Sequence, residues 1–318
     1  MSTTMSSYSP FSQTEARNEY PALAESQQRM CWITIGVLTA LLFLAFFDSL
    51  FATYHIWQGP QYAHGFIIPI ISAVLLYIRK ESFRDVPGWH RWIGVGLILF
   101  GMVLRVFGGL ATVVVLTNWA LIPCLLGVFI LVGGLPTMRW AGPAIVFLLL
   151  MYPFPRIVEE SLMHPLQRTA AACSSFTLTT MGIEAVREQN TIYLGESGQK
   201  MDVAAQCSGL RMLTVFTAMG IAVALFLTER PLWERLLIVV SAIPIAVMAN
   251  VFRITLTGLL FELLNVQDLN KGWVHYFAHD AAGFVMIPVA MGLFFLEYQI
   301  LKRLVVEQRD EAGPLSVT

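Results

Sequence analysis

Charged residues are scarce in this chain: Asp, Glu, Lys and Arg make up 13% of its 318 residues, roughly half the share in an average soluble domain. Hydrophobic residues make up 56%, and the mean hydropathy is +0.66. A water-soluble core of this size cannot hold so many apolar side chains. The composition therefore predicts a polytopic membrane protein, and the formal net charge of -1 gives no sign of nucleic-acid binding.

Cysteines are also few, and their spacing is not paired. Cys31, Cys124 and Cys173 fall in apolar or helical stretches, where a buried thiol behaves as a small hydrophobe. The spacing indicates neither a disulfide framework nor a zinc knuckle. We therefore expect no metal and no other cofactor.

Long apolar runs dominate the chain, and a helix needs about 20 such residues to cross a bilayer. The first run lacks the basic start and cleavage site of a signal peptide, so we expect it to be retained. The second is the weakest, and a shallow or re-entrant segment there would leave seven spans. The sequence predicts an all-α membrane protein with about eight transmembrane helices, at 31–51, 62–78, 92–109, 112–133, 139–154, 208–228, 236–264 and 279–300.

Basic residues fix the expected orientation, because cytoplasmic loops carry the excess of Lys and Arg. The loops at 52–61 and around 110 contain none. With eight crossings, both termini are cytoplasmic and every basic short loop falls on that side. These basic residues are Arg79, Lys80, Arg84, Arg91, Arg139, Arg230, Arg235, Lys302, Arg303 and Arg309.

This topology divides the chain into a flexible cytoplasmic tail (1–30), a transmembrane domain (31–300) and a second cytoplasmic tail (301–318). It leaves one long extracytoplasmic insert, at 155–207. Helical spacing from Glu159 to Met181 predicts an amphipathic helix on the bilayer surface, with an apolar face of Leu162, Leu166, Ala170, Cys173 and Phe176. Alternation and two glycines between Ile183 and Ala205 predict a small β-hairpin.

The run Ala205-Gln206-Cys207-Ser208-Gly209-Leu210-Arg211 lies where this insert meets the next apolar helix. Free backbone N–H groups and the helix dipole stabilise a thiolate at such a junction. Ser208 and Gly209 permit close backbone approach, and Arg211 lies one turn on, on the same face as Cys207. Cys207 is therefore either a reactive thiol or one more inert cysteine.

Arg253 falls inside the seventh apolar run, and Asn250 shares its helix face. A charge at mid-membrane costs about 2.5–3.5 kcal/mol, so it is seldom idle. Arg253 either serves a functional site or binds backbone carbonyls to hold helices together. A second arginine, Arg105, lies toward the outer end of the third span, within reach of lipid phosphates.

His279 opens the last apolar run, followed by Asp280, at the same predicted boundary as Cys207. Its ordinary pKa of about 6.5 suits a general base. His275 and His279 form an i, i+4 pair, but zinc would need a third ligand such as His64 or Asp280. His64, with Gly65, begins the second span on the outer side, where it is a supporting candidate for the same cavity.

Together these blocks resemble the exosortases, relatives of the archaeosortases. The resemblance covers about residues 45–300 and rests on Cys207 to Arg211, on Asn250 to Ile254, and on His279 with Gly283. Weaker matches are Tyr62 to Gly65 and Pro165 to Gln167. The chain departs from the family at Gln189-Asn190, where members often have a glycine before the asparagine.

The resemblance implies a membrane cysteine transpeptidase of the bacterial inner membrane, with its active site facing the periplasm. Cys207 would be the nucleophile, His279 the base and Arg253 the group that stabilises charge, supported by Ser208, Gly209, Arg211, Asn250, His64 and Asp280. Implied partners are substrate proteins with a C-terminal sorting signal (a Pro-Glu-Pro-type, or PEP-CTERM, motif, an apolar helix and a basic cluster), the lipid bilayer and exopolysaccharide export machinery.

Other classes of protein fit the residues alone. In a transporter, Arg253 and Asn250 would bind an anionic substrate and Cys207 would be incidental, although no inverted repeat is visible. A metal enzyme would use His64, His275 and His279. A structural subunit of a polysaccharide export complex would need none of these residues.

Overall fold

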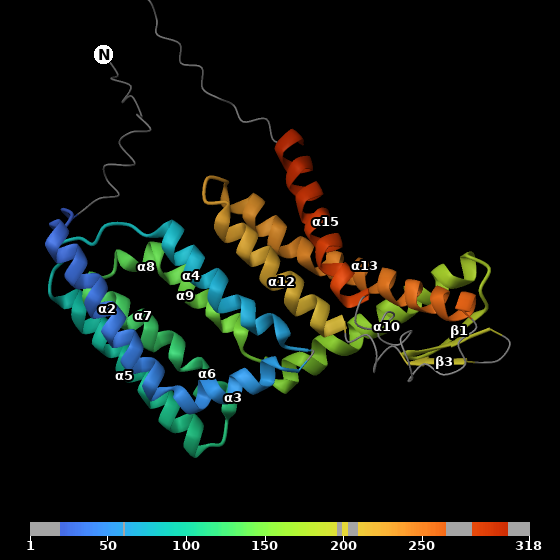
Figure 1. Ribbon diagram of the computed structural model, residues 1–318, viewed down its shortest axis with the longest axis horizontal. Helices are drawn as coiled ribbons and strands as arrows, with labels where there is room; N and C mark the ends of the chain where they lie inside the picture. Colours follow the sequence, from blue (N-terminus) through green and yellow to red (C-terminus); the bar gives the residue numbers. More distant parts are fainter. Residues whose placement is uncertain (1–19, 60, 196–198, 203–208, 265–281, 305–318) are drawn as a thin grey trace, which may run out of the picture. The chain divides into compact units, whose positions relative to one another are not determined.

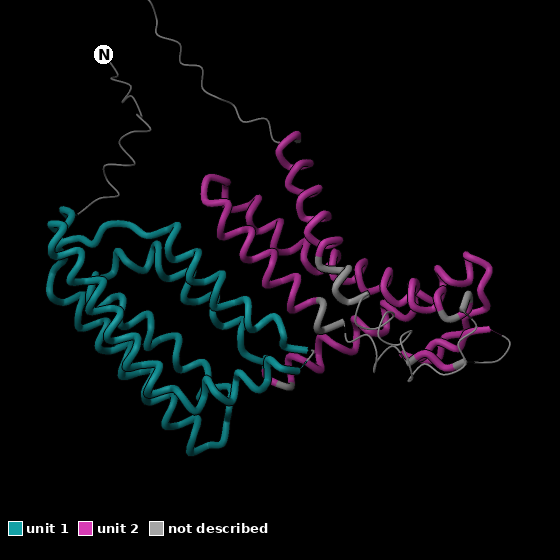
Figure 2. The backbone as a smooth tube through the Cα atoms, viewed as in Figure 1, with its two compact units in different colours: residues 1–154 teal, residues 155–318 magenta. Residues whose placement is uncertain are grey.

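The computed structural model describes residues 20–59, 61–195, 199–202, 209–264 and 282–304 (Figure 1). Its chain divides into two compact units, Met1–Phe154 and Pro155–Thr318 (Figure 2). Each unit is described by itself below. The division falls where Pro153 and Pro155 follow the last helix of the first unit. Proline disfavours continuation of a helix because it lacks a backbone N–H.

In its described secondary structure, unit 1 consists of helices, apart from one isolated antiparallel β-bridge between Ala22 and Arg84. Several of its apolar runs are broken into shorter helices, as at Phe46, whose φ of -101° and ψ of 13° are not helical. The elements are α2 (Glu25–Ala45), α3 (Phe47–Trp57), η1 (Ala63–Phe66), α4 (Ile67–Arg79), α5 (Trp89–Leu110), α6 (Val114–Trp119), α7 (Leu121–Gly133), α8 (Thr137–Trp140), α9 (Gly142–Phe147) and η2 (Leu148–Met151).

A glycine seam on α5 lets this helix pack closely on the α6–α7 segment. Gly94, Gly101 and Gly108 are each buried, and their spacing of seven residues keeps them on one helix face. A Cβ at Gly94 would lie 2.5 Å from the backbone nitrogen of Leu131. The backbones therefore approach as closely as small residues allow in membrane helix pairs.

Unit 2 joins long helices to a small sheet. Three of its helices, α10, α13 and α15, contain proline, at Pro165, Pro244 and Pro288. The elements are α10 (Arg156–Thr180), β1 (Ala185–Glu188), β2 (Thr191–Leu194), β3 (Gln199–Asp202), α12 (Gly209–Phe226), α13 (Leu232–Leu264) and α15 (Ala282–Leu304).

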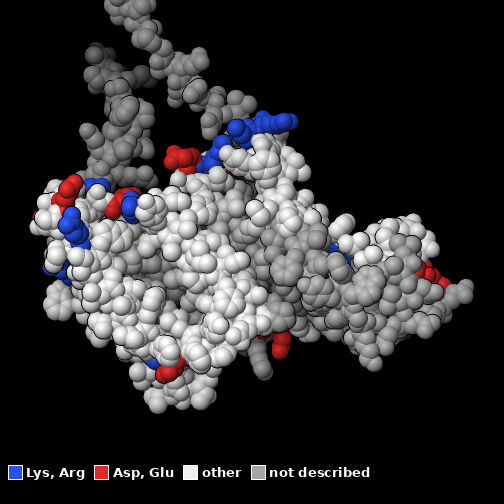
Figure 3. Space-filling model, viewed as in Figure 1, with Lys and Arg blue, Asp and Glu red and all other residues white. Residues whose placement is uncertain are grey.

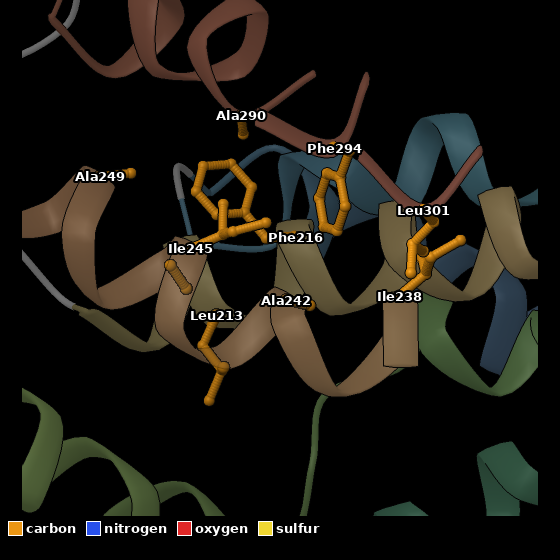
Figure 4. Close-up of a cluster of buried hydrophobic side chains, with 10 residues drawn as sticks. Leu213, Phe216, Ile238, Ala242, Ile245, Ala249, Ala290, Phe294 and Leu301 are labelled. Atoms are coloured by element: carbon orange, nitrogen blue, oxygen red, sulfur yellow. The ribbon is translucent and has the colours of Figure 1, made fainter. Parts of the chain in front are cut away.

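The core of unit 2 lies among α12, α13 and α15. Figure 4 shows Phe216 of α12 turned toward Ile245 of α13 and Ala290 of α15, and all three side chains are buried. The same cluster continues to Ala249 on α13. On α13 this cluster therefore ends one residue before Asn250.

The sheet has three antiparallel strands in the order β1-β2-β3, one more than the predicted hairpin. The additional strand arises because a two-residue turn at Gln189-Asn190 pairs Glu188 with Thr191. Gln189 has a φ of 53°, a left-handed conformation that costs most residues about 1–2 kcal/mol. At this position the chain departs from the family that it resembles, and a glycine would adopt this conformation without that cost.

The prediction of a mostly helical membrane protein with a small β element is confirmed. Each of the eight expected apolar segments overlaps a helix. Four described helical segments are long and apolar enough to cross a membrane: Glu25–Ala45, Trp89–Leu110, Val114–Gly133 and Leu232–Leu260. The weak second segment forms the shorter apolar helix Ala63–Arg79.

Basic side chains gather at particular helix ends within each unit. Figure 3 shows them in unit 1 near the start of α2 and the end of α4, where Arg79 and Lys80 lie. In unit 2 they gather at the end of α15, with Lys302 and Arg303. The predicted orientation requires basic residues to gather at the cytoplasmic ends of helices. The orientation itself stays a prediction.

Candidate functional site

Arg253 is buried in α13 with 2% of its surface exposed. Asn250, three residues earlier, is equally buried, and helical spacing places the two on one face. The Oδ1 atom of Asn250 has no hydrogen-bond partner among the described residues. A buried guanidinium beside a buried amide offers several donors and an acceptor to a polar group entering the site.

The segment of α13 that carries Arg253 is held by α10. The hydroxyl of Ser174 donates a hydrogen bond to the carbonyl oxygen of Val251, 3.3 Å away, and Ser174 is fully buried. Ile254, also fully buried, packs in one cluster with Ala170 and Leu178 of α10. Contacts with α10 therefore hold the helix at Val251, before Arg253, and at Ile254, after it.

The sheet packs into the same cluster. Ile192 and Leu194 of β2 and Met201 of β3 are buried there with Ile254, and Ser175 of α10 donates a hydrogen bond to the carbonyl oxygen of Ala185, 2.8 Å away. Strand β3 ends at Asp202, five residues before Cys207, and α12 begins at Gly209. The chain on both sides of Cys207 is thus anchored within unit 2.

Helix α10 buries a different set of residues in the protein from most of the apolar face predicted for the bilayer surface. Leu162, Cys173 and Phe176 of that predicted face are exposed, and their contact with lipid stays a prediction. The buried residues are Gln167, Ala170, Ala171, Ser174, Ser175 and Leu178. Small and polar residues allow α10 to lie close to α13 and the sheet, whereas the apolar periodicity follows the exposed side. The spacing of the buried serines and alanines was the signal that sequence reasoning missed.

Other predicted site residues lie outside the described residues. These are Cys207, Ser208, His275, His279 and Asp280. Gly209 and Arg211 lie in the first turn of α12, two and four residues after Cys207. Helix α15 begins at Ala282, three residues after His279. Their roles therefore remain predictions.

His64 lies in unit 1, in the single-turn helix η1, and is half-buried. Its neighbour Gly65 has a packing reason to be glycine, since a Cβ there would lie 2.2 Å from Nε1 of Trp57. That indole nitrogen donates a hydrogen bond to the carbonyl oxygen of Met151, 2.8 Å away. The His-Gly pair thus shapes the end of this unit, and a part for His64 in the site stays a prediction.

Comparison with known proteins gives one match, to the transmembrane exosortases, over residues 56–296. This match covers most of the chain. The protein belongs to the transmembrane exosortase family. No curated protein and no solved structure matches it. Exosortases are membrane cysteine transpeptidases whose substrates are membrane proteins that carry sorting signals, and all three sequence blocks that predicted this family lie within the matched range.

Proposed function

We propose that this exosortase cleaves a C-terminal sorting signal of the PEP-CTERM type and transfers the protein to an acceptor for export to the surface. The catalytic residues would be Cys207, Arg253 and His279. The observation that carries the proposal is the family match, which spans these three residues in their predicted order. The burial of Arg253 and the anchoring of the chain beside Cys207 support it.

The reaction is an acyl transfer through a thioester. His279 accepts the thiol proton of Cys207, and the sulfur attacks the carbonyl carbon of the scissile peptide bond. As the C–N bond breaks, His279 returns the proton to the leaving amine. An acceptor amine, or water, then attacks the thioester, forming an amide or an acid and regenerating the thiol.

Arg253 would stabilise the negative charge that develops on the carbonyl oxygen. Fixed donors act most strongly where water is excluded, and Arg253 is held in a buried position by the α10 contacts. Asn250 would help to bind substrate, as would Ser208, Gly209, Arg211, His64 and Asp280 from their predicted positions.

We place the protein in the bacterial inner membrane, with both termini in the cytoplasm and the site facing the periplasm. A sorting signal would then present its motif at the outer face and its basic cluster in the cytoplasm. This arrangement agrees with the basic residues at the ends of α4 and α15. Exopolysaccharide export machinery would be a further partner.

The test is processing of a co-expressed substrate that ends in the motif, an apolar helix and a basic cluster, followed on a blot of the membrane fraction. Wild type is expected to shorten the substrate, and Cys207→Ala to leave it intact. Cys173→Ala, which alters an exposed cysteine in α10, should process normally. Processing that persists in Cys207→Ala would refute the nucleophile assignment and favour a transport role for Arg253.

A further inference from the structure

Arg105 places a second guanidinium within the membrane-spanning part of the chain, in unit 1. It lies on α5, five residues before the helix ends at Leu110, or about 7 Å along the helix axis. A charged side chain at this depth is costly unless it meets an anion or a polar cavity. At this distance from the helix end, an arginine side chain reaches the interface.

The guanidinium lies over an aromatic ring. Its Cζ atom lies 4.3 Å from the centroid of the Phe46 ring, and Phe46 is fully buried at the break between α2 and α3. A cation–π contact of this kind leaves the N–H donors of the guanidinium available to other partners. Nη1 is buried and forms no hydrogen bond within the described part of the chain.

No carboxylate in the described residues neutralises this charge. The ion pairs of that part of the chain, taken at 4.0 Å or less, do not include Arg105. Asp48, at the start of α3, has an exposed side chain and forms no ion pair with it. The cation of Arg105 therefore lacks a protein partner of opposite charge there.

A second buried donor lies at the same level of the bundle. Arg105 falls between Gly101 and Gly108 along α5, and these glycines pack against Ala120 and Thr117 of the facing segment. Trp119 lies in that segment, and its Nε1 is buried without a hydrogen-bond partner among the described residues. The nearby amide oxygen of Asn118 already accepts a hydrogen bond from Ser49. Two buried side-chain donors at this level of unit 1 therefore have no hydrogen-bond partner among the described residues.

We propose that Arg105 and Trp119 bind the phosphate group of a phospholipid from the leaflet where α5 ends. Phosphate oxygens accept paired hydrogen bonds from the planar fork of arginine, and the indole N–H supplies one further donor. The lipid neutralises a charge that the described residues of unit 1 leave uncompensated. This site is independent of the proposed transpeptidase reaction, and no residue of that reaction takes part.

The test is lipid-dependent stability of the full-length protein, delipidated in a neutral detergent. Phosphatidylglycerol is titrated in, with diacylglycerol of the same chains and inorganic phosphate as separate arms, and thermal unfolding is followed. Wild type should gain stability with phosphatidylglycerol, more than with either control. Arg105→Met should require about tenfold more lipid or lose the gain, because a charge-assisted contact is removed. Without lipid it should be at least as stable as wild type, because an unpaired charge is gone.

Arg91→Met is the matched control, because it removes an exposed arginine from the first turns of the same helix. It should keep the full response to phosphatidylglycerol. If diacylglycerol stabilises wild type as much as phosphatidylglycerol does, the proposal is overturned. It is also overturned if phosphatidylglycerol stabilises Arg105→Met as much as it stabilises wild type. A response to inorganic phosphate as large as that to the lipid would overturn the assignment to a lipid.

Discussion

Asn190, in the turn between β1 and β2, donates a hydrogen bond from Nδ2 to Oε1 of Gln167 in α10, 3.1 Å away. Gln167 is buried with 2% of its surface exposed. This bond ties the sheet to the helix that supports Arg253. It also gives both residues a structural reason to be present, apart from any contact with substrate.

Replacing Asn190 with alanine should therefore destabilise unit 2. The change leaves the amide oxygen of Gln167 buried without its donor, which costs about 1–3 kcal/mol. Thermal unfolding in detergent would show a lower midpoint. In the Gln167→Met background the same change should cost much less, since no buried acceptor remains. A midpoint equal to that of wild type in Asn190→Ala alone would contradict the role given to this bond.

Two glycines of α5 should respond in opposite directions to alanine. At Gly94 the atoms that a Cβ would meet belong to the backbone of α7, at 2.5–2.8 Å, so Gly94→Ala should cost about 1–3 kcal/mol by overpacking. At Gly96 nothing lies within 4 Å, and Gly96→Ala should gain up to about 1 kcal/mol in helix propensity. If the unfolding midpoint falls for both variants, close packing of the glycine seam does not explain the loss of stability in Gly94→Ala.

Glu159 of α10 should make stability depend on pH. Burial and the neighbouring Glu160 raise the pKa of Glu159 above its ordinary value of 4.5. The folded state therefore favours the protonated carboxyl, and this contribution is present at low pH and is lost as the pH rises through the folded-state pKa. Relative to Glu159→Gln, wild type should lose stability between about pH 4.5 and neutral.

Thermal unfolding of both proteins across that range measures the difference directly. Adding Glu160→Gln to each should shrink it, because the repulsion from Glu160 is one of the two causes. A difference that is constant with pH, or that narrows toward neutral pH, would contradict the burial seen for the Glu159 carboxyl.

Arg253 should tolerate neither alanine nor lysine if it stabilises the oxyanion. Loss of one such donor slows acyl transfer by about 10²–10³-fold, and lysine cannot reproduce the planar pair of donors. Single-turnover processing rates measure this, with Arg168→Ala as control because Arg168 is exposed on α10. Full activity in Arg253→Lys would exclude planar recognition. A correctly folded Arg253→Ala with wild-type rate would remove Arg253 from the catalytic set.

The sequence predicted the helical membrane class because hydropathy depends on composition over about 20 residues. It could not place the breaks at Phe46 and Ala120, since apolar runs continue through them. Periodicity located the apolar stripe of α10 but not the side of the helix that packs against the protein, because small and polar residues form that side. The buried stripe there is built from Gln167, Ser174 and small residues, which a hydropathy reading assigns to solvent.

The chemical type of a residue identified candidates for the site, whereas the sequence could not show which residues contact one another. Arg253 was a candidate because a charge in an apolar helix needs a reason, and it is buried as that reasoning requires. The part of Ser174 in positioning the Arg253 segment could not be predicted, because it depends on a hydrogen bond to Val251, 77 residues away in the chain. The distances from Cys207 and His279 to Arg253 fall outside the described residues and remain predictions.

The most direct test of the account is detection of the thioester on Cys207. Membranes containing enzyme and sorting-signal substrate would be quenched in acid, and the covalent adduct would be mapped by mass spectrometry before and after hydroxylamine, which cleaves thioesters. The account predicts a hydroxylamine-sensitive adduct on Cys207 in wild type and in Cys173→Ala, and none in Cys207→Ala. An adduct that survives in Cys207→Ala, or processing by that variant at the wild-type rate, would contradict it.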